Sequence, residues 1–223
     1  MKRMRYPALF RSAACLVLVA SSTALDAAEA ATTTSIVVFN TICARCHEGE
    51  CSGRLSFDNV DTIARGHIMR HYPAASEAPD LQRDLVRIID YMKEHCAYYP
   101  MREPVPRDGI WDERLLDRLV TPEKRFYFIP LGHLEAGRHR IELELERPGS
   151  VRVELLSQDF DLIVDGCHDS STGRIVIPFE TGTAGDYYLR LYPKAKQAIR
   201  VRRLRVVERS RRSQENPSRS PAR

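Results

Sequence analysis

The 223-residue sequence lacks the marks of several large protein classes. Its one compact apolar run, at 12–20, is far shorter than the about 20 residues that a membrane-spanning helix needs. No internal repeat is visible, and no nucleophile and general base stand at a catalytic spacing. A polytopic membrane protein and a repeat array are therefore excluded, and the sequence points to no catalytic residues.

Neither positive nor negative charge is in large excess in the body of the chain. The formal net charge is +4, and removing residues 1–30 leaves about +2, because four basic and two acidic groups go with them. The segment 209–223 alone holds five arginines against one glutamate, so the remaining body is slightly acidic. A nucleic-acid partner, which needs a basic patch within a fold, is not expected. The segment 209–223 has no large apolar residue and is predicted to be a disordered basic tail.

The N-terminus has the pattern of a secretory signal peptide over residues 1–30. Four basic residues precede or border the short apolar run, and Ala28-Glu29-Ala30 is an A-x-A cleavage signature. We therefore expect a protein exported to the periplasm. Membrane association is expected only through an uncleaved signal or through the basic tail.

The most specific motif is "CARCH" at residues 43–47. Two cysteines separated by two residues and followed at once by histidine are typical of covalent haem attachment. Two other sites use similar residues. A zinc site would draw on Cys43, Cys46, His47 and Cys51, with Cys96 as a further ligand, and a redox dithiol would need a βαβ setting that is not visible.

The segment around the motif resembles a c-type cytochrome of the single-haem kind. Helical spacing precedes the motif, and Leu81, Leu85 and Met92 form one apolar face of a closing helix that ends before Pro100. The resemblance covers roughly 35–100. It implies a small all-α domain in which Cys43 and Cys46 bind one haem c covalently and His47 is the proximal iron ligand.

The resemblance leaves the distal iron ligand open. His67 shares a predicted helical face with Ile63 and is the preferred candidate, whereas Met69 points nearly opposite on the same helix. His71 and Met101 are further candidates for the same position.

A disulfide bond between Cys51 and Cys96 is also expected. In an oxidising compartment, two cysteines left over in one small domain tend to pair. That pairing leaves Cys167 as the remaining thiol of the exported chain.

The second half of the chain shows strand patterns instead. In "HRIELELE", Ile141, Leu143 and Leu145 alternate with glutamates, as expected for a half-buried antiparallel strand. Similar alternation occurs in five further runs separated by turn signals, and six short strands predict a β-sandwich. The six runs are 125–130, 139–146, 151–157, 173–180, 186–193 and 199–208.

Two weaker motifs lie within the predicted sandwich. The aspartates of "SQDFDLIVDGCHDSS" could bind calcium, although their spacing matches no EF-hand loop. Cys167 and His168 could form a metal or redox pair. For the aspartates, the simpler interpretation is an ordinary turn rich in aspartate and serine. For Cys167, the simpler interpretation is a cysteine that is buried or that forms a dimer.

These observations predict an α+β chain: a signal at 1–30, a cytochrome c-like domain at 31–104, a linker with a short helix at 105–122, a β-sandwich at 123–208 and a tail at 209–223. The function expected from the resemblance is periplasmic electron transfer to a redox partner protein, with the sandwich docking that partner. The alternative is a haem-based sensor or enzyme subunit with an open iron site.

Overall fold

The computed structural model describes residues 30–47, 60–194 and 198–208, without the side chains of 46–47 and 60–64. The predicted signal peptide and the predicted tail lie outside these residues. Within them, no helix is both long and apolar enough to cross a membrane.

The helices are α1 (Thr33–Val38), a π-helical turn η1 (Phe39–Cys43), α2 (Ala44–His47), α3 (Val60–His71), a 3₁₀ turn η2 (Pro73–Glu77), α4 (Pro79–His95) and α5 (Glu113–Leu116). The strands are β1 (Ile110–Asp112), β2 (Tyr127–Leu134), β3 (Gly137–Leu145), β4 (Gly149–Ser157), β5 (Leu162–Ser170), β6 (Arg174–Thr181), β7 (Gly185–Pro193) and β8 (Val201–Glu208).

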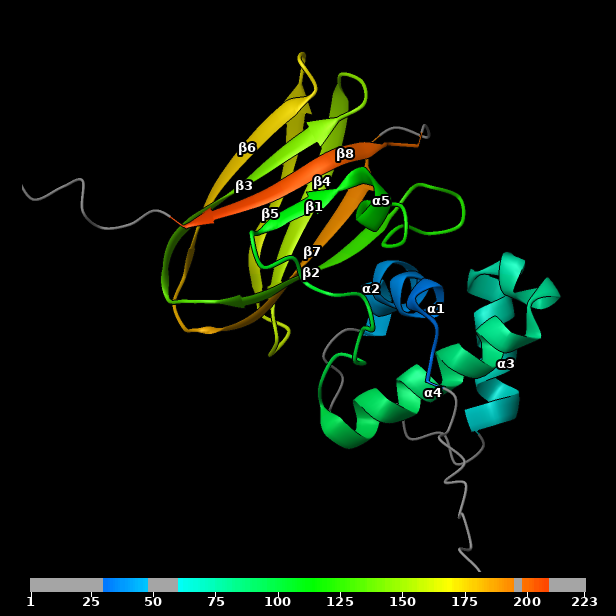
Figure 1. Cartoon of the computed structure of the whole chain (residues 1–223). Helices are drawn as coiled ribbons and strands as arrows, with labels where there is room; N and C mark the ends of the chain where they lie inside the picture. The colour runs from blue at the N-terminus through cyan, green and yellow to red at the C-terminus, as the bar shows by residue number, and fades with distance from the viewer. Residues whose placement is uncertain (1–29, 48–59, 195–197, 209–223) are drawn as a thin grey trace, which may run out of the picture. The chain divides into compact units, whose positions relative to one another are not determined.

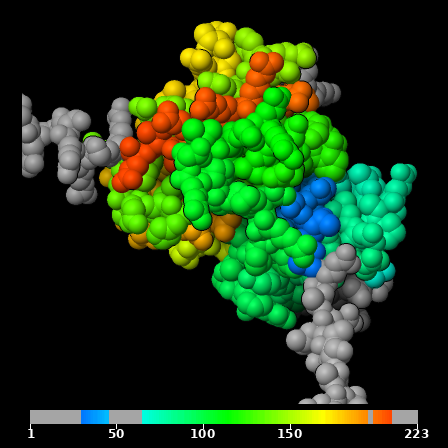
Figure 2. All heavy atoms as spheres, in the orientation of Figure 1, coloured from blue at the N-terminus to red at the C-terminus, as the bar shows by residue number. Residues whose placement is uncertain are grey.

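The strands form two antiparallel four-stranded sheets that face each other as a sandwich (Figure 1). One sheet has the order β1-β8-β3-β6, and the other has the order β2-β7-β4-β5. In the space-filling view (Figure 2), β8 runs in orange and red beside the green segment that carries β1 and α5. This neighbourhood agrees with the pairing of Trp111 in β1 with Leu204 in β8.

The sandwich core comes from the period-two alternation of the strands. In β3, Ile141, Leu143 and Leu145 are buried, whereas the glutamates between them are partly exposed. The same alternation recurs in β6, where Ile175 and Ile177 are buried. Two such faces exclude water from the space between the sheets, which is the main favourable contribution to folding.

Strand β2 departs from this alternation because it is buried on both faces. Five successive residues from Tyr127 to Leu131 are buried. Ile129 belongs to the sandwich core, whereas its neighbour Phe128 belongs to a second hydrophobic cluster with the helices. The ring of Tyr98, which follows α4, lies 5.7 Å from that of Phe128 and 4.2 Å from that of Tyr188 on β7. The outer face of this sheet is therefore covered by the helical segment.

The apolar face of helix α4 packs against α1 and η1. Leu85, Ile88 and Met92 are buried in the second cluster together with Ile36 and Phe39 of the first helical turns. Pro79 fits the first turn of α4, and Cys96 ends the helix in a left-handed conformation, with φ 49°.

A buried carboxylate joins α1 to α4. Asp84 accepts hydrogen bonds from the backbone N–H of Thr32 at 2.9 Å and from the hydroxyl of Ser35 at 2.8 Å. Arg87 lies 3.1 Å from the other carboxylate oxygen. Thr32 also caps α1 by accepting from the backbone N–H of Ser35. The start of α1 and one turn of α4 are thus held by one acidic side chain.

The expected sandwich is confirmed, while the expected cytochrome-like all-α domain is not shown. Each of the six predicted runs lies largely within a strand, β2, β3, β4, β6, β7 or β8. Strand β5 was missed because "LIVDGCHDS" carries Asp, Gly and His in place of a regular apolar alternation. The stretch 105–122, predicted as a linker with a short helix, contains both β1 and α5, and Trp111 is buried in the sandwich core.

The joint at Asp84 can be tested by substitution. Asp84→Ala removes the acceptor shared by the Thr32 N–H and the Ser35 hydroxyl and is expected to lower the free energy of unfolding by about 2 kcal/mol. Urea unfolding followed by circular dichroism measures the change. The control is Asp80→Ala, which removes a carboxylate that is 86% exposed and paired only with Arg83 on the same helix, and it should change stability by less than about 0.5 kcal/mol. Equal effects of the two variants would contradict the assignment.

Candidate ligand-binding site

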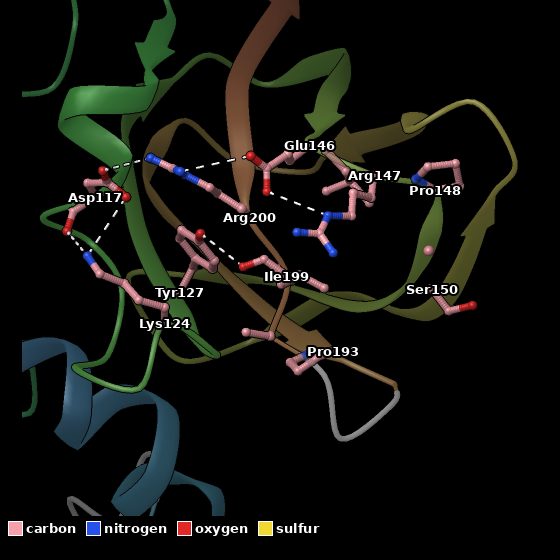
Figure 3. Close-up of a pocket in the computed structure, with 13 residues that line it drawn as sticks. Asp117, Lys124, Tyr127, Glu146, Arg147, Pro148, Ser150, Pro193, Ile199 and Arg200 are labelled. Carbon is pink, nitrogen blue, oxygen red and sulfur yellow. Dashed lines mark hydrogen bonds and ion pairs between the residues drawn. The ribbon is translucent and has the colours of Figure 1, made fainter.

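A hollow of about 640 Å³ lies at one end of the sandwich, where β3 ends and β4 begins and where β7 ends before β8. This volume falls in the range of about 300–1,000 Å³ that is usual for small-molecule sites. Figure 3 shows charged side chains around the hollow and an apolar floor beneath them. The lining residues are Asp117, Lys124, Tyr127, Leu145, Glu146, Arg147, Pro148, Gly149, Ser150, Pro193, Ala198, Ile199 and Arg200.

Arg200 holds the charged part of the hollow together. Its Nη2 atom lies 2.9 Å from Glu113 and 3.5 Å from Asp117, and its Nη1 atom lies 3.9 Å from Glu146. Figure 3 shows the contacts to Asp117 and Glu146. The backbone N–H of Glu146 donates to the carbonyl of Arg200 at 2.8 Å. The guanidinium is 48% exposed, so each single ion pair contributes little stability. Their joint effect is to fix three carboxylates around one planar cation.

A hydrogen-bonded tyrosine forms part of the floor. The hydroxyl of Tyr127 donates to the carbonyl of Ile199 at 3.3 Å and accepts from the backbone N–H of Val201 at 3.2 Å. These bonds tie the start of β8 to the start of β2. Burial raises the pKa of Tyr127 above its usual range, the largest of several influences on that group. The floor is therefore a rigid surface whose polar atom is already occupied.

The walls offer donors and acceptors in close alternation. Asp117 and Glu146 present carboxylate oxygens, whereas Lys124, Arg147 and Arg200 present N–H groups. Arg147 is 85% exposed, and its nearest described carboxylate, that of Glu146, is 3.9 Å away, beyond hydrogen-bonding distance. A ligand hydroxyl both donates and accepts, so a ligand with several hydroxyl groups can use both kinds of wall residue.

The predicted haem motif lies elsewhere, on the helical segment. Cys43 ends the π-helical turn and is partly buried. Arg45, two residues on, lies over the ring of Tyr192 at 4.4 Å and over that of Phe126 at 5.6 Å. The motif is thus attached to the outer face of the sheet by a cation–π contact. The side chains of Cys46 and His47 lie outside the described residues.

The candidate distal ligands lie on α3 and in the segment that follows α4. His67 and His71 are both exposed, and their rings lie 4.3 Å apart on the surface of α3. Met69 is 40% exposed. Met101 is partly buried and packs between the two hydrophobic clusters. The side chain of Ile63, on whose placement the choice of His67 rested, lies outside the described residues.

The cysteines are only partly accounted for. Among those with described side chains, Cys43 and Cys167 keep their thiols, and Cys96 is in a disulfide bond. Its predicted partner Cys51 lies outside the described residues, so the pairing of Cys51 with Cys96 stays a prediction. Cys167 is exposed on β5, opposite Arg152 of β4.

The aspartates weighed as calcium ligands make protein contacts instead. Asp165 accepts two hydrogen bonds from Arg152, at 2.8 and 3.0 Å, and Asp169 accepts one from Ser150. The backbone N–H groups of Asp159 and Asp161 donate to the hydroxyl of Ser157. No group of three or more histidine, cysteine or acidic side chains stands ready to bind a metal ion anywhere in the part of the chain that is described.

Comparisons with known proteins return only distant structural likenesses. No family model and no curated protein matches the chain. A carbohydrate-binding domain, CBM36-1 of a multidomain xylanase from the hindgut metagenome of Trinervitermes trinervoides, is 15% identical over 39% of this chain and 74% of its own, with a TM-score of 0.27. A CBM36 module in complex with calcium and xylotriose is 13% identical over 37% and 72%, with a TM-score of 0.24. The 4-O-methyl-alpha-glucuronidase BtGH115A is 10% identical over 68% and 24%, with a TM-score of 0.29.

The expected kinship with c-type cytochromes is wrong, and with it the expected electron transfer and haem-based sensing. The expected redox partner stays a prediction. No cluster of metal-binding side chains is present among the residues that the structure describes. Most of the described elements are strands. The apolar face of α4 packs with side chains of α1 and η1 in one hydrophobic cluster.

The residues of the hollow were not predicted from the sequence. The stretch from Arg147 to Ser150 served only as a turn signal, and Arg200 only as part of a strand pattern. Charged residues at strand ends are common and carry no distinctive spacing. A usable signal lies in "ELERPGS", where charged side chains crowd a tight turn that joins two strongly amphipathic strands.

Buried tyrosines on the outer face of the sheet predict a loss of stability at high pH. Burial, the largest influence in each case, raises the pKa of Tyr188 and of Tyr192 to about 12. Each tyrosine is ordinarily ionised above about pH 10 when unfolded. The unfolded state therefore releases these protons first, and the free energy of unfolding should fall between about pH 10 and 12. Denaturation at stepped pH, with absorbance at 295 nm for tyrosinate, measures this fall.

The control for this pH dependence is Tyr192→Phe. Phenylalanine keeps the ring under Arg45 but cannot ionise. The variant should lose less stability over the same pH interval than the unmodified protein. An unchanged slope would show that Tyr192 titrates normally in the folded chain.

Proposed function

We propose that this chain is an exported binding protein whose β-sandwich holds a hydroxyl-rich ligand, a carbohydrate, in the hollow at its end. The signal-like N-terminus supports export. The observation that carries the ligand class is the ring of paired donors and acceptors that Arg200 organises with Asp117 and Glu146.

The chemistry of the hollow suits sugars better than other small molecules. A sugar presents hydroxyl groups along its ring edge and C–H groups on its faces. Carboxylates and guanidinium groups on the walls can each engage two neighbouring hydroxyls. Leu145, Pro193 and Ile199 supply an apolar surface on which a sugar face can pack. A purely apolar ligand would cover partly exposed charged groups without offering them hydrogen bonds, which is costly.

The ion pairs that line the hollow also affect how tightly a sugar is expected to bind, because they order the side chains in advance. Arg200 is held by three carboxylates before any ligand arrives, so little side-chain entropy is lost when it binds. Arg147 is the exception, because it is largely exposed and must be ordered. We therefore expect modest affinity for one sugar unit, with Arg200 contributing more than Arg147.

Isothermal titration calorimetry with a panel of soluble oligosaccharides tests the proposal. The panel includes xylotriose, β-1,3-galactotriose, cellotriose, chitotriose and a trigalacturonate. At least one member should bind, and Arg200→Ala should weaken that binding about tenfold, equivalent to about 1.4 kcal/mol. Arg147→Ala should weaken it by a smaller factor.

The matched control is Arg174→Ala. Arg174 is a 76%-exposed arginine on β6 that pairs with Glu144 and does not line the hollow. It should bind the same oligosaccharide as tightly as the unmodified protein does. A thermal melt of each variant checks that the fold is intact. No binding by any member at millimolar concentration, or equal binding by Arg200→Ala and the unmodified protein, would refute the proposal.

A further inference from the structure

A second hollow, of about 410 Å³, adjoins the first. The two share a pair of lining residues, Asp117 and Lys124. The second hollow brings together the start of α1, the segment after α4 and the turn that follows α5. Its lining residues are Thr33, Thr34, Glu103, Asp117, Arg118, Val120, Thr121, Pro122 and Lys124.

The two shared residues are joined to each other, and Lys124 is held both by its backbone and by its ammonium group. Lys124 has a φ of 55°, in the left-handed region that residues other than glycine rarely adopt. Its backbone N–H donates to the carbonyl of Thr121 at 2.8 Å, and its ammonium donates to the carbonyl of Asp117 at 3.1 Å. The side chain is nevertheless 56% exposed. A ligand can therefore lie over Lys124 and bond to its ammonium without displacing it.

The second hollow has the same chemical character as the first. Glu103 accepts from Arg118 at 2.8 Å and from the hydroxyl of Thr33 at 3.3 Å. Arg118 is 46% exposed, and Thr34 adds a hydroxyl group to the lining. Donors and acceptors again alternate along a wall. A hydroxyl-rich ligand that leaves the first hollow over Lys124 thus meets a second surface suited to it.

We propose that the two hollows are neighbouring subsites of one groove, and that the ligand is an oligosaccharide chain that crosses Lys124. This inference rests on the proposed function. It assigns Arg118 and Thr34 to the binding of a further sugar unit, beyond the unit that Arg200 binds. Each hollow is large enough for a small ligand by itself. Contacts in both should therefore make affinity depend on chain length.

Titration with one sugar series of one to six units tests the groove. The series is built on whichever panel sugar binds to the first hollow. The unmodified chain should bind the hexasaccharide about tenfold more tightly than the monosaccharide. Arg118→Ala should remove most of that gain while leaving monosaccharide binding unchanged. Thr34→Val, which keeps the side-chain shape but loses the hydroxyl, should reduce the gain by a smaller factor.

Arg114→Ala is the matched control, because Arg114 is an arginine on α5 that lines neither hollow. It should bind every chain length as the unmodified protein does. If the monosaccharide and the hexasaccharide bind equally and Arg118→Ala has no effect, the groove is refuted while the first hollow stands. If no sugar of any length binds, the groove and the proposed function both fail.

Discussion

The need to cover the outer face of one sheet governs the architecture of this chain. Strands β2 and β7 carry large side chains on both faces, so water must be excluded from both sides of the sheet. The opposite sheet covers one side. The helices cover the other through Tyr98, which packs on Phe128 and Tyr188. The helical segment is accordingly part of the packing of the sandwich.

The same packing shows how the segment around the motif differs from the expected small all-α domain. A C-x-x-C-H pattern specifies local spacing, but a haem also needs an apolar surface to cover it. Here Leu85, Ile88 and Met92 of α4 pack on α1 and on the π-helical turn. Arg45, inside the motif, is engaged with Tyr192 of the sheet. Spacing within five residues cannot reveal how the rest of the segment packs on the sheet.

The sandwich was predictable from the sequence because the alternation of apolar and polar residues along a strand shows which face of that strand is buried in the core. Glutamates between Ile141, Leu143 and Leu145 fix which side of β3 faces the core, and six strands of that kind are compatible with few folds. The double burial of β2 had a visible signal as well, since Tyr127, Phe128 and Ile129 are successive large apolar residues. The arrangement of charges in the hollow had a signal only at the turn between β3 and β4, and none for Arg200. Asp117 and Arg200 are 83 positions apart by subtraction of their numbers, and only the pairing of strands brings them within 3.5 Å.

The π-helical turn at Phe39–Cys43 determines which way the motif faces. A π-helical turn holds one residue more than an α-helical turn, and each residue of a helix rotates the chain by about 100°. The extra residue therefore rotates the side chains that follow it about the helix axis by about a quarter of a revolution. With that offset, Arg45 reaches the ring of Tyr192. In a continuous α-helix the Arg45 side chain would point in a different direction around the helix axis, and α2 would lose its contact with Tyr192 of the sheet.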